Sequence, residues 1–346
     1  MKEEYEAWLQ EKVPLHERLT PILVTTIQGM IKQADIDFLS VTGRTKSLKD
    51  VKEKIERKQY RNPQKQLTDI SGVRVITFFE SQVDEVAKII DDAFSVDADN
   101  SLDKSTMLGT DRIGYRSVHY VCDLGKSRAK LIEYKPFSGL KFEIQIRTVL
   151  QHAWAELSHD RNYKFSSVLP PQIQRQLNLY AGMLELADKG FDELAKAIDG
   201  YQKQLDLESG ESFYNQEINS LSVSEFLERG LSKFSFEISS TPSDKLTLVV
   251  SELKRYGVQN LKGLKKLFNK EFIDARNSLG GNKKTTYAGL LRDAMLFADY
   301  EKYFNRSWGE SAWSWCDSDL ITLLSKKYDK ETVHNAFIEN GIMVVE

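Results

Sequence analysis

The stretch Lys141-Phe-Glu-Ile-Gln-Ile-Arg147 alternates polar and apolar side chains. Successive side chains of a strand point to opposite faces, so this pattern places Glu143, Gln145 and Arg147 together on one face. A second strand-like run extends from Gly72 to Phe79. Acids and arginines gathered on neighbouring strands of one sheet would suit a metal ion and a nucleotide polyphosphate. We therefore expect this sheet to carry chemistry as well as packing.

Composition indicates a soluble globular protein. The 346 residues are 41% hydrophobic and 29% charged, and the length is sufficient for two domains. The two cysteines, Cys122 and Cys316, match no zinc or disulfide spacing, which favours a reducing, cytoplasmic location. The acidic N-terminus lacks a signal-peptide pattern, and no run of about 18 apolar residues occurs. We expect neither export nor a membrane partner.

The apolar pattern predicts an α+β first domain at residues 1–209 and a mostly helical second domain at residues 210–346, with a linker near Gly210. The expected elements are leading helices at 4–37, interrupted near Pro14 and Pro21, helices at 48–58, 82–94, 149–164 and 171–206, and strands at 71–79, 116–123, 129–135, 140–147 and 245–250. A cluster of Trp308, Trp313 and Trp315 is interpreted as aromatic core rather than as a platform for bases.

Positive charge is concentrated in residues 40–66. This segment holds nine basic and three acidic residues, in a chain whose net charge is −3. Within it, a glycine turn at Gly43 is followed by Arg44, Lys46 and, further on, Lys54. Glycine would let the backbone approach a phosphate, lysine supplies a point charge, and arginine forks onto phosphate or stacks on a base. A solvated helix face is the alternative interpretation.

Two further segments carry candidate ligands. Asp69 precedes a strand that contains Arg74, and magnesium binds through one or two carboxylates plus substrate phosphates, so Asp69 and Glu143 would suffice. Tyr115 follows a glycine, where a base could stack on its ring. Taken singly, these residues are equally explained as a strand cap, a surface arginine and a core aromatic.

In series, these segments resemble the synthetase domain of the RelA/SpoT family, which transfers pyrophosphate from ATP to the 3′-hydroxyl of GTP or GDP. The resemblance covers about residues 35–165 and implies a nucleotidyltransferase-like mixed β-sheet flanked by helices. The motifs that carry it are Gly43-Arg-Thr-Lys-Ser47 with Lys54, Asp69-x-x-Gly-x-Arg74, Gly114-Tyr-Arg-Ser-Val-His119 and Glu143-Ile-Gln-Ile-Arg-Thr148, continuing to Trp154-Ala, His159 and Tyr163-Lys164.

The resemblance implies a role for each motif residue. Asp69 and Glu143 would be the catalytic residues and would hold Mg²⁺, with Glu143 facing the acceptor hydroxyl. ATP would be bound by Arg44, Lys46, Lys54 and Arg74, and the acceptor by Tyr115, His119, Gln145, Arg147 and His152. Two positions depart from the family pattern: Asp50 stands where many members have serine, and His152 stands where short members often have asparagine.

The sequence leaves three functions open. The first is a small alarmone synthetase with ATP as donor and GTP or GDP as acceptor. The second is a toxic relative that pyrophosphorylates the 3′ CCA end of tRNA, in which residues 210–346 would neutralise the toxin or bind a protein partner. The third is a degenerate domain that only binds nucleotide or a partner. A basic stretch at 262–284 would either contact RNA or be solvated. Tetramers are common among the synthetases, so a homo-oligomer is a further expectation.

Overall fold

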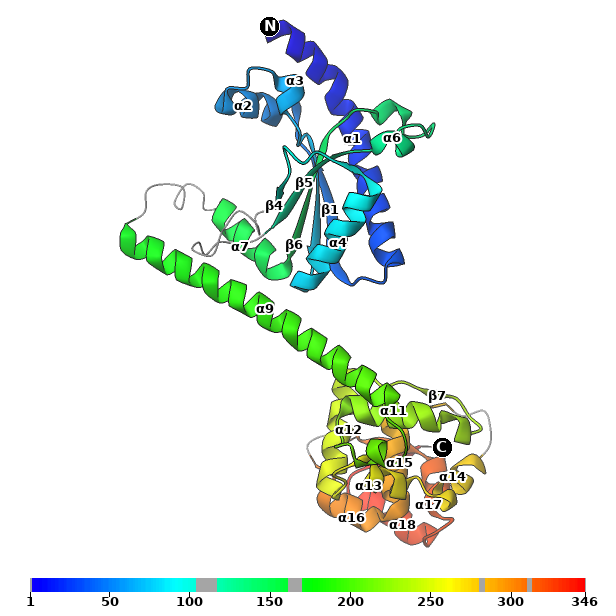
Figure 1. The fold of residues 1–346 in the computed structure, drawn as a ribbon. Helices are drawn as coiled ribbons and strands as arrows, with labels where there is room; N and C mark the ends of the chain where they lie inside the picture. Colours follow the sequence, from blue (N-terminus) through cyan, green and yellow to red (C-terminus); the bar gives the residue numbers. More distant parts are fainter. Residues whose placement is uncertain (1, 104–116, 161–169, 280–283, 310–312, 346) are drawn as a thin grey trace. The chain divides into compact units, whose positions relative to one another are not determined.

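The chain divides into two compact units. The computed structural model describes residues 2–103, 117–160, 170–279, 284–309 and 313–345 (Figure 1). Contacts between residues separate unit 1, Met1–Lys196, from unit 2, Ala197–Glu346. This division falls inside the long helix α9 (Pro171–Leu207), so α9 contributes residues to both units.

Unit 1 is built on a mixed sheet, as predicted. The described strands run in the order β1-β2-β6-β5-β3, with β4 pairing to β5. Strands β2 and β6 are parallel, and the other neighbours are antiparallel. The strand bounds are β1 Phe38–Thr45, β2 Ser71–Thr77, β3 Ser95–Val96, β4 Leu102–Asp103, β5 Val118–Asp123 and β6 Phe142–Thr148.

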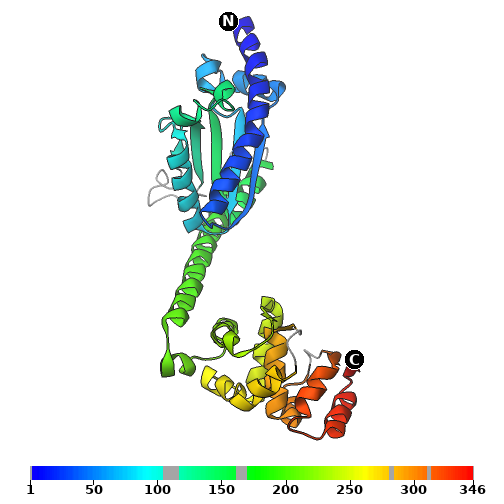
Figure 2. The same ribbon diagram turned by 90° about the vertical axis from the view of Figure 1, so that its right-hand side faces the viewer.

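Helices α1 (Lys2–Gln33) and α4 (Glu80–Ala93) cover one face of this sheet, and α1 crosses it obliquely in Figure 2. Residues spaced by four along α1 lie on one side of a helix. Here they form a stripe of buried side chains that packs on the apolar face of β2 and β6, namely Leu19, Leu23, Ile27 and Ile31 against Val73, Val75, Ile144 and Ile146. The opposite face of the sheet remains available for a site.

Helix α1 continues through Pro14 and Pro21, where an interruption was predicted. A proline inside a helix removes one backbone hydrogen bond and crowds the preceding turn. Buried side chains lie on both sides of the two prolines, including Leu9, Val13 and Leu19. Because tertiary packing supplies most of the stability of a helix in a protein, burial of this face outweighs the lost bonds.

A buried polar network ties α1 to the first two strands. The His16 ring Nδ1 lies 2.8 Å from Ser71 Oγ, and Thr20 Oγ1 lies 2.9 Å from the same oxygen and 2.6 Å from Thr45 Oγ1. Burial lowers the pKa of His16 to about 4, so the ring is neutral near pH 7. The network satisfies polar groups that would otherwise be costly inside the protein.

Two of the predicted strands are wrong, and in unit 1 the strands β1, β3 and β4 were missed. Residues 129–135 lie in turns between α6 (Gly125–Arg128) and a 3-10 helix (Lys135–Phe137), and Leu131 and Ile132 are exposed rather than buried in alternation. Residues 245–250 lie in α12 (Ser243–Tyr256), because their buried side chains recur at helical rather than at strand spacing. Strand β1 was read as a glycine turn, since a glycine interrupts its pattern.

The remaining helices of unit 1 are α2 (Leu48–Lys58), α3 (Pro63–Gln66) and α7 (Val149–Asp160). The first part of α9 docks on this unit through two buried carboxylates. Thr148 Oγ1 donates to Asp188 at 2.6 Å, and the Ser81 backbone N–H donates to Asp192 at 3.1 Å. Both contacts are made at helix starts, because Thr148 precedes α7 and Ser81 lies in the first turn of α4.

Unit 2 is mostly helical, as predicted, and has a hydrophobic core of its own. Two short parallel strand pairs join its helices, β7 (Ile238–Ser239) with β8 (Thr285–Thr286) and β9 (Trp315–Asp317) with β10 (Met343–Val345). The other helices are α10 (Gly210–Asn215), α11 (Ser220–Gly230), a 3-10 helix (Leu231–Lys233), α13 (Leu261–Leu267), α14 (Lys270–Asn277), α15 (Tyr287–Ala298), α16 (Tyr300–Arg306), α17 (Ser318–Leu324) and α18 (Lys330–Glu339).

Both cysteines are buried free thiols. Burial raises the pKa of each thiol to about 12, so neither is a reactive thiolate near neutral pH. Among the described residues, no helix has the length and apolar character needed to span a membrane.

The docking of α9 makes stability depend on pH. Burial raises the pKa of Asp188 to about 6, so the folded protein binds more protons than the unfolded chain between about pH 4 and 6. Stability contributed by this group therefore falls as the pH rises through that window. Replacing it by the neutral isostere, Asp188→Asn, should raise the free energy of unfolding at pH 7 by about 1–3 kcal/mol and flatten the decline.

Urea unfolding at pH 4, 5, 6 and 7 measures this difference. Asp199→Asn, on an exposed part of the same helix, is the matched control and should leave the pH profile unchanged. The stability gained by Asp188→Asn over the parent should be larger at pH 7 than at pH 4. A larger gain at pH 4 would contradict the burial argument.

Candidate functional site

Polar side chains form two rows across the sheet face that α1 and α4 leave uncovered. Residues directly opposed in neighbouring strands point to the same face. One row consists of Thr42, Arg74, Gln145 and His119, which are opposed in register across β1, β2, β6 and β5. The next row, two residues along, contains Arg44, Gly72 and Glu143. Pairing of the strands thus brings together residues that the sequence holds far apart.

These rows border a cavity of about 340 Å³. It is lined by Thr42, Gly43, Arg44, Lys46, Gly72, Val73, Arg74, Glu143, Gln145 and Glu156. Of the eleven residues predicted to form the site, five line this cavity, namely Arg44, Lys46, Arg74, Glu143 and Gln145, and His119 lies in the first row. Asp69 bonds to Lys46, Lys54 bonds to Asp69, Arg147 lies beside His119, and His152 lies beside Glu156. The volume lies within the range of small-molecule sites.

Asp69 lies beside this cavity with two lysines on a single carboxylate oxygen. Lys46 Nζ is 2.8 Å and Lys54 Nζ is 2.6 Å from Asp69 Oδ2, whereas the buried Oδ1 has no hydrogen-bond partner. Burial opposes ionisation of this carboxyl, but the two lysines outweigh it and hold its pKa below the usual range. The group is therefore an ionised carboxylate with one oxygen available.

Glu143 is positioned by two hydrogen bonds from its own sheet face. His119 Nδ1 lies 3.1 Å from Glu143 Oε1, and Gln145 Nε2 donates to Oε2 at 3.2 Å. Arg147 Nη2 lies 3.2 Å from His119 Nε2. Because arginine can only donate, Nε2 of His119 accepts and its Nδ1 carries the proton that goes to Glu143.

This arrangement keeps Glu143 ionised. Burial and the nearby charge of Asp69 disfavour the carboxylate, but the hydrogen bond from His119 prevails and the pKa of Glu143 lies below its usual value. Arg147 is buried, its Nε has no partner, and burial lowers its pKa. An arginine N–H left unpaired inside a protein is costly unless a ligand accepts from it.

Two arginines line the cavity, Arg44 from β1 and Arg74 from β2, and each is paired with an acid. Arg74 Nη1 donates to Glu156 Oε1 at 2.8 Å, and Arg44 Nη2 lies 3.5 Å from Asp50. Asp50 also completes the capping box of α2 with Ser47, so this departure from the family pattern serves the helix start and Arg44.

His152, on α7, extends the site beyond the sheet. Its buried Nδ1 lies 3.6 Å from Glu156 Oε1, which is too far for a hydrogen bond, and has no other hydrogen-bond partner among the described residues. Burial, together with the charge of Arg74, lowers the pKa of this imidazole. Tyr115 lies outside the described residues, as do the motif segment Tyr163-Lys164 and the side chain of His159.

Gly43 does not form the phosphate-binding glycine turn that the sequence predicted. It lies within β1, and a Cβ at this position would stand 2.6 Å from Thr20 Cγ2 and 2.6 Å from Val24 Cγ2. The missing side chain therefore permits the close approach of α1 to the sheet, and no phosphate-binding turn is formed here. Gly72 is the glycine that borders the cavity without such crowding, since a Cβ there would meet only Arg44 O at 3.9 Å.

Sequence reasoning missed Glu156 and Gly72 as site residues. Glu156 is four residues after His152, and this spacing puts both residues on one side of a helix. Glu156 could therefore have been predicted from the position of His152. Gly72 is directly opposed to Glu143 across the parallel pair. Its significance depends on strand pairing, which no local pattern reveals.

The carboxylates of this site would suit a magnesium ion that takes most of its ligands from water and substrate, rather than a metal ion held wholly by protein ligands. Among the described residues, no group of three or more His, Cys, Asp or Glu could hold a metal. Mg²⁺ typically takes one or two carboxylates and completes its shell with water and substrate phosphates. The unpartnered, buried Oδ1 of Asp69 fits that requirement, and the ionised Glu143 would be the second carboxylate.

The two glycines give a matched pair of substitutions. Gly43→Ala should lower the free energy of unfolding by about 1–3 kcal/mol, because its methyl group would overlap α1. Gly72→Ala should fold with nearly unchanged stability while its methyl group enters the cavity. Thermal unfolding of both variants measures the difference, and equal destabilisation would contradict the assignment of the two faces.

Known proteins are similar to this chain over the residues that form the site. Residues 43–167 match the family described as the region found in RelA / SpoT proteins. GTP pyrophosphokinase YwaC of Bacillus subtilis is 28% identical over 163 residues, which cover 45% of this chain and 73% of that protein. GTP pyrophosphokinase YjbM of the same organism is 28% identical over 167 residues, covering 47% of this chain and 74% of that protein.

Among solved structures, a GTP pyrophosphokinase family protein from Streptococcus pneumoniae is 27% identical, with a TM-score of 0.46, over 58% of this chain and 97% of that one. The family match spans Arg44, Asp69, Arg74, Glu143 and the other described site residues, and it ends before α9. Residues 43–167 of this chain are thus similar to the region found in RelA / SpoT proteins, whereas α9 and the rest of the C-terminal region lie outside the match.

Proposed function

We propose that unit 1 is a pyrophosphokinase that transfers the β,γ-pyrophosphate of ATP to the 3′-hydroxyl of GTP or GDP, giving AMP and the alarmone (p)ppGpp. One observation carries the proposal: a single cavity has arginines at one end, a lysine-bound carboxylate beside it and an ionised, hydrogen-bonded glutamate on its floor. The names of two relatives, both GTP pyrophosphokinases, support the same reaction.

The donor end would be formed by β1, β2 and α2. Arg44 and Arg74 flank the cavity and would stack on the adenine, with orientations set by Asp50 and Glu156. Lys46 and Lys54 would bind the phosphates. Both are bonded to Asp69 in this structure, so two positive charges face one carboxylate and positive charge remains for a polyphosphate.

The acceptor end would be formed by β5, β6 and α7. Glu143 would accept the proton of the 3′-hydroxyl as that oxygen bonds to the β-phosphorus, while the bond between the β-phosphorus and the oxygen shared with the α-phosphorus breaks and AMP leaves. His119 holds one oxygen of Glu143 and Gln145 the other, which fixes the direction of the free lone pairs. His152, Arg147 and Tyr115 would line the acceptor nucleotide.

Mg²⁺, bound by Asp69 and Glu143, would neutralise the charge that develops on the transferred phosphates. The residues themselves would supply the rest by positioning and charge. Phosphoryl-type transfer needs little covalent participation from the protein, so a preorganised set of charges accounts for much of the rate.

The acceptor is tested by following label from γ-³²P-ATP in the presence of Mg²⁺ with GTP, GDP or deacylated tRNA. We expect label in guanine nucleotide together with AMP formation, and no transfer when EDTA removes the divalent cation. Label that moves only to tRNA would replace the proposed acceptor by the 3′ CCA end. Label that moves to none of the three would argue for a domain that only binds.

The role of Glu143 is tested by Glu143→Gln, which keeps an acceptor for the His119 N–H but removes the charge. Turnover should fall by a factor of about 100 or more, because general-base catalysis and charge neutralisation are both lost. The melting temperature should stay close to that of the parent.

Glu53→Gln is the matched control, because Glu53 is exposed on α2, where its Oε1 lies 3.9 Å from Lys49 Nζ. It should retain full turnover. Transfer by Glu143→Gln at the parental rate would remove this residue from the mechanism without affecting the identity of the acceptor.

A further inference from the structure

Unit 2 contains a larger cavity than unit 1, and no part of the proposed reaction uses it. Its volume is about 620 Å³, within the range of sites that enclose small molecules. The cavity lies between the starts of α12, α15 and α17 and the end of α14, next to strands β8 and β9. All of its lining residues belong to unit 2.

One wall of this cavity is apolar. Its large side chains are Leu248, Leu279, Leu320, Leu323, Trp313 and Trp315. Leu248 is 47% exposed and Trp315 is 63% exposed, although both are large apolar groups. Trp313 instead packs on the core, and its ring centre lies 5.4 Å from that of Trp308 in an edge-to-face contact, as predicted for core aromatics. The same prediction is wrong for the exposed Trp315. A planar apolar body would cover this wall.

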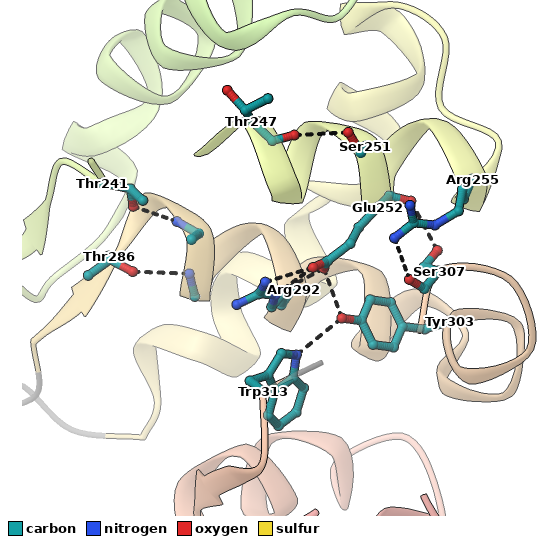
Figure 3. Close-up of polar contacts among 12 residues, drawn as sticks. Thr241, Thr247, Ser251, Glu252, Arg255, Thr286, Arg292, Tyr303, Ser307 and Trp313 are labelled. Carbon is teal, nitrogen blue, oxygen red and sulfur yellow. Dashed lines mark hydrogen bonds and ion pairs between the residues drawn. The ribbon is translucent and has the colours of Figure 1, made fainter. Parts of the chain in front are cut away.

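Arg292 also lines this cavity, and one edge of its guanidinium group is hydrogen-bonded to a carboxylate. Its Nε and Nη2 donate to the buried carboxylate of Glu252 at 2.9 and 2.6 Å. Tyr303 donates to the same carboxylate at 2.9 Å, and Trp313 Nε1 donates to the Tyr303 hydroxyl at 3.2 Å (Figure 3). Among the described residues, the remaining nitrogen, Nη1, has no hydrogen-bond partner.

A second arginine reaches the same space. Arg276 is only 8% exposed, its Nε donates to Asp293 at 3.0 Å, and its guanidinium lies 4.5 Å from the centre of the Phe236 ring. Both terminal nitrogens lack a partner among the residues that the structure describes. The ring and the carboxylate hold the guanidinium in one orientation, so little conformational entropy would be lost on binding.

Both arginines line the cavity, so a ligand there that accepts from their free N–H groups would add charge-assisted hydrogen bonds. Each arginine already faces one carboxylate, so the local charge is nearly balanced and a polyanion is not favoured. Of the other charged groups on the cavity, Lys284 pairs with Glu237 at 2.8 Å, and Asp317 caps α17. Lys245 is exposed at the rim, where it would add a positive charge, and Asp319 adds a negative one.

We propose that this cavity binds a small amphipathic anion. Its carboxylate or phosphate accepts hydrogen bonds from the free N–H groups of Arg276 and Arg292, and its planar apolar body lies against Trp313, Trp315 and the leucines. This assigns a ligand site to the C-terminal region that is separate from the proposed transferase site.

Isothermal titration of the full chain tests the charge and the shape together. The probes are indole-3-acetate and 1-naphthyl phosphate as the carboxylate and phosphate forms, indole-3-acetamide as the neutral form and tryptamine as the cation. At least one anion should bind about tenfold or more tightly than the amide, which is the effect of a charge-assisted hydrogen bond. Equal binding of the amide or of the amine, or no binding of either anion up to millimolar concentration, would overturn the proposal.

Three variants locate the site. Leu248→Trp places a bulky side chain at the mouth, outside the core, and should weaken binding of the anion by tenfold or more. Arg276→Gln should abolish the preference for the anion over the amide, whereas Arg306→Gln, an exposed arginine outside the cavity, should change nothing.

Melting temperatures show whether each variant is folded, and Leu248→Trp keeps the test decisive if Arg276→Gln is unstable. Undiminished binding by Leu248→Trp, or equal losses in Arg276→Gln and Arg306→Gln, would place the anion elsewhere.

Discussion

The parallel pairing of β2 with β6 is the constraint on which the rest of unit 1 depends. Its register sets Gly72 opposite Glu143 and Arg74 opposite Gln145. A slip by one residue would turn Glu143 into the core under α1 and expose Ile144 to solvent, because side chains alternate between faces. Burial of the apolar face therefore holds the polar face in place, and stability and chemistry are specified by the same register.

On that polar face, charges are arranged in compensating groups. Two lysines surround Asp69, and an acid holds each arginine at the opposite end of the cavity. Such pairing lowers the cost of placing many charges near one another. It also keeps the side chains oriented before a substrate arrives, and incoming phosphates would then exchange with carboxylates already in place. Among the described residues, the buried side-chain atoms without a hydrogen-bond partner are Asp69 Oδ1, Arg147 Nε and His152 Nδ1, and all three lie in this site.

Unit 2 shows the same principle in a different setting. Its buried arginines are each half satisfied by a carboxylate, and the other half of each fork borders a hollow. In unit 1 the charged groups outnumber the apolar ones around the cavity, which suits polyphosphate. In unit 2 two tryptophans and four leucines line the cavity together with the arginines, which suits a more apolar molecule with a single anionic group. The two cavities are thus distinct in the chemistry they would recognise.

Local pattern was sufficient for much of this protein, because alternation, charge and motif spacing are properties of short segments. It placed Glu143, Gln145 and Arg147 on one strand, Asp69 at the mouth of another, and the long helix near residue 171. Local pattern failed for residues 129–135, which lie largely exposed in turns, and for residues 245–250, whose buried side chains recur at helical spacing.

By itself, the sequence determined the likeness of residues 43–167 to RelA / SpoT proteins and the side chains available for chemistry. Only the tertiary structure decided that Gly43 serves the packing of α1, that Glu156 reaches Arg74, and that Arg276 and Arg292 share one cavity. The physical reason is that each of these depends on contact between segments far apart in the chain. Such contacts are selected by the burial of whole faces, which no single segment encodes.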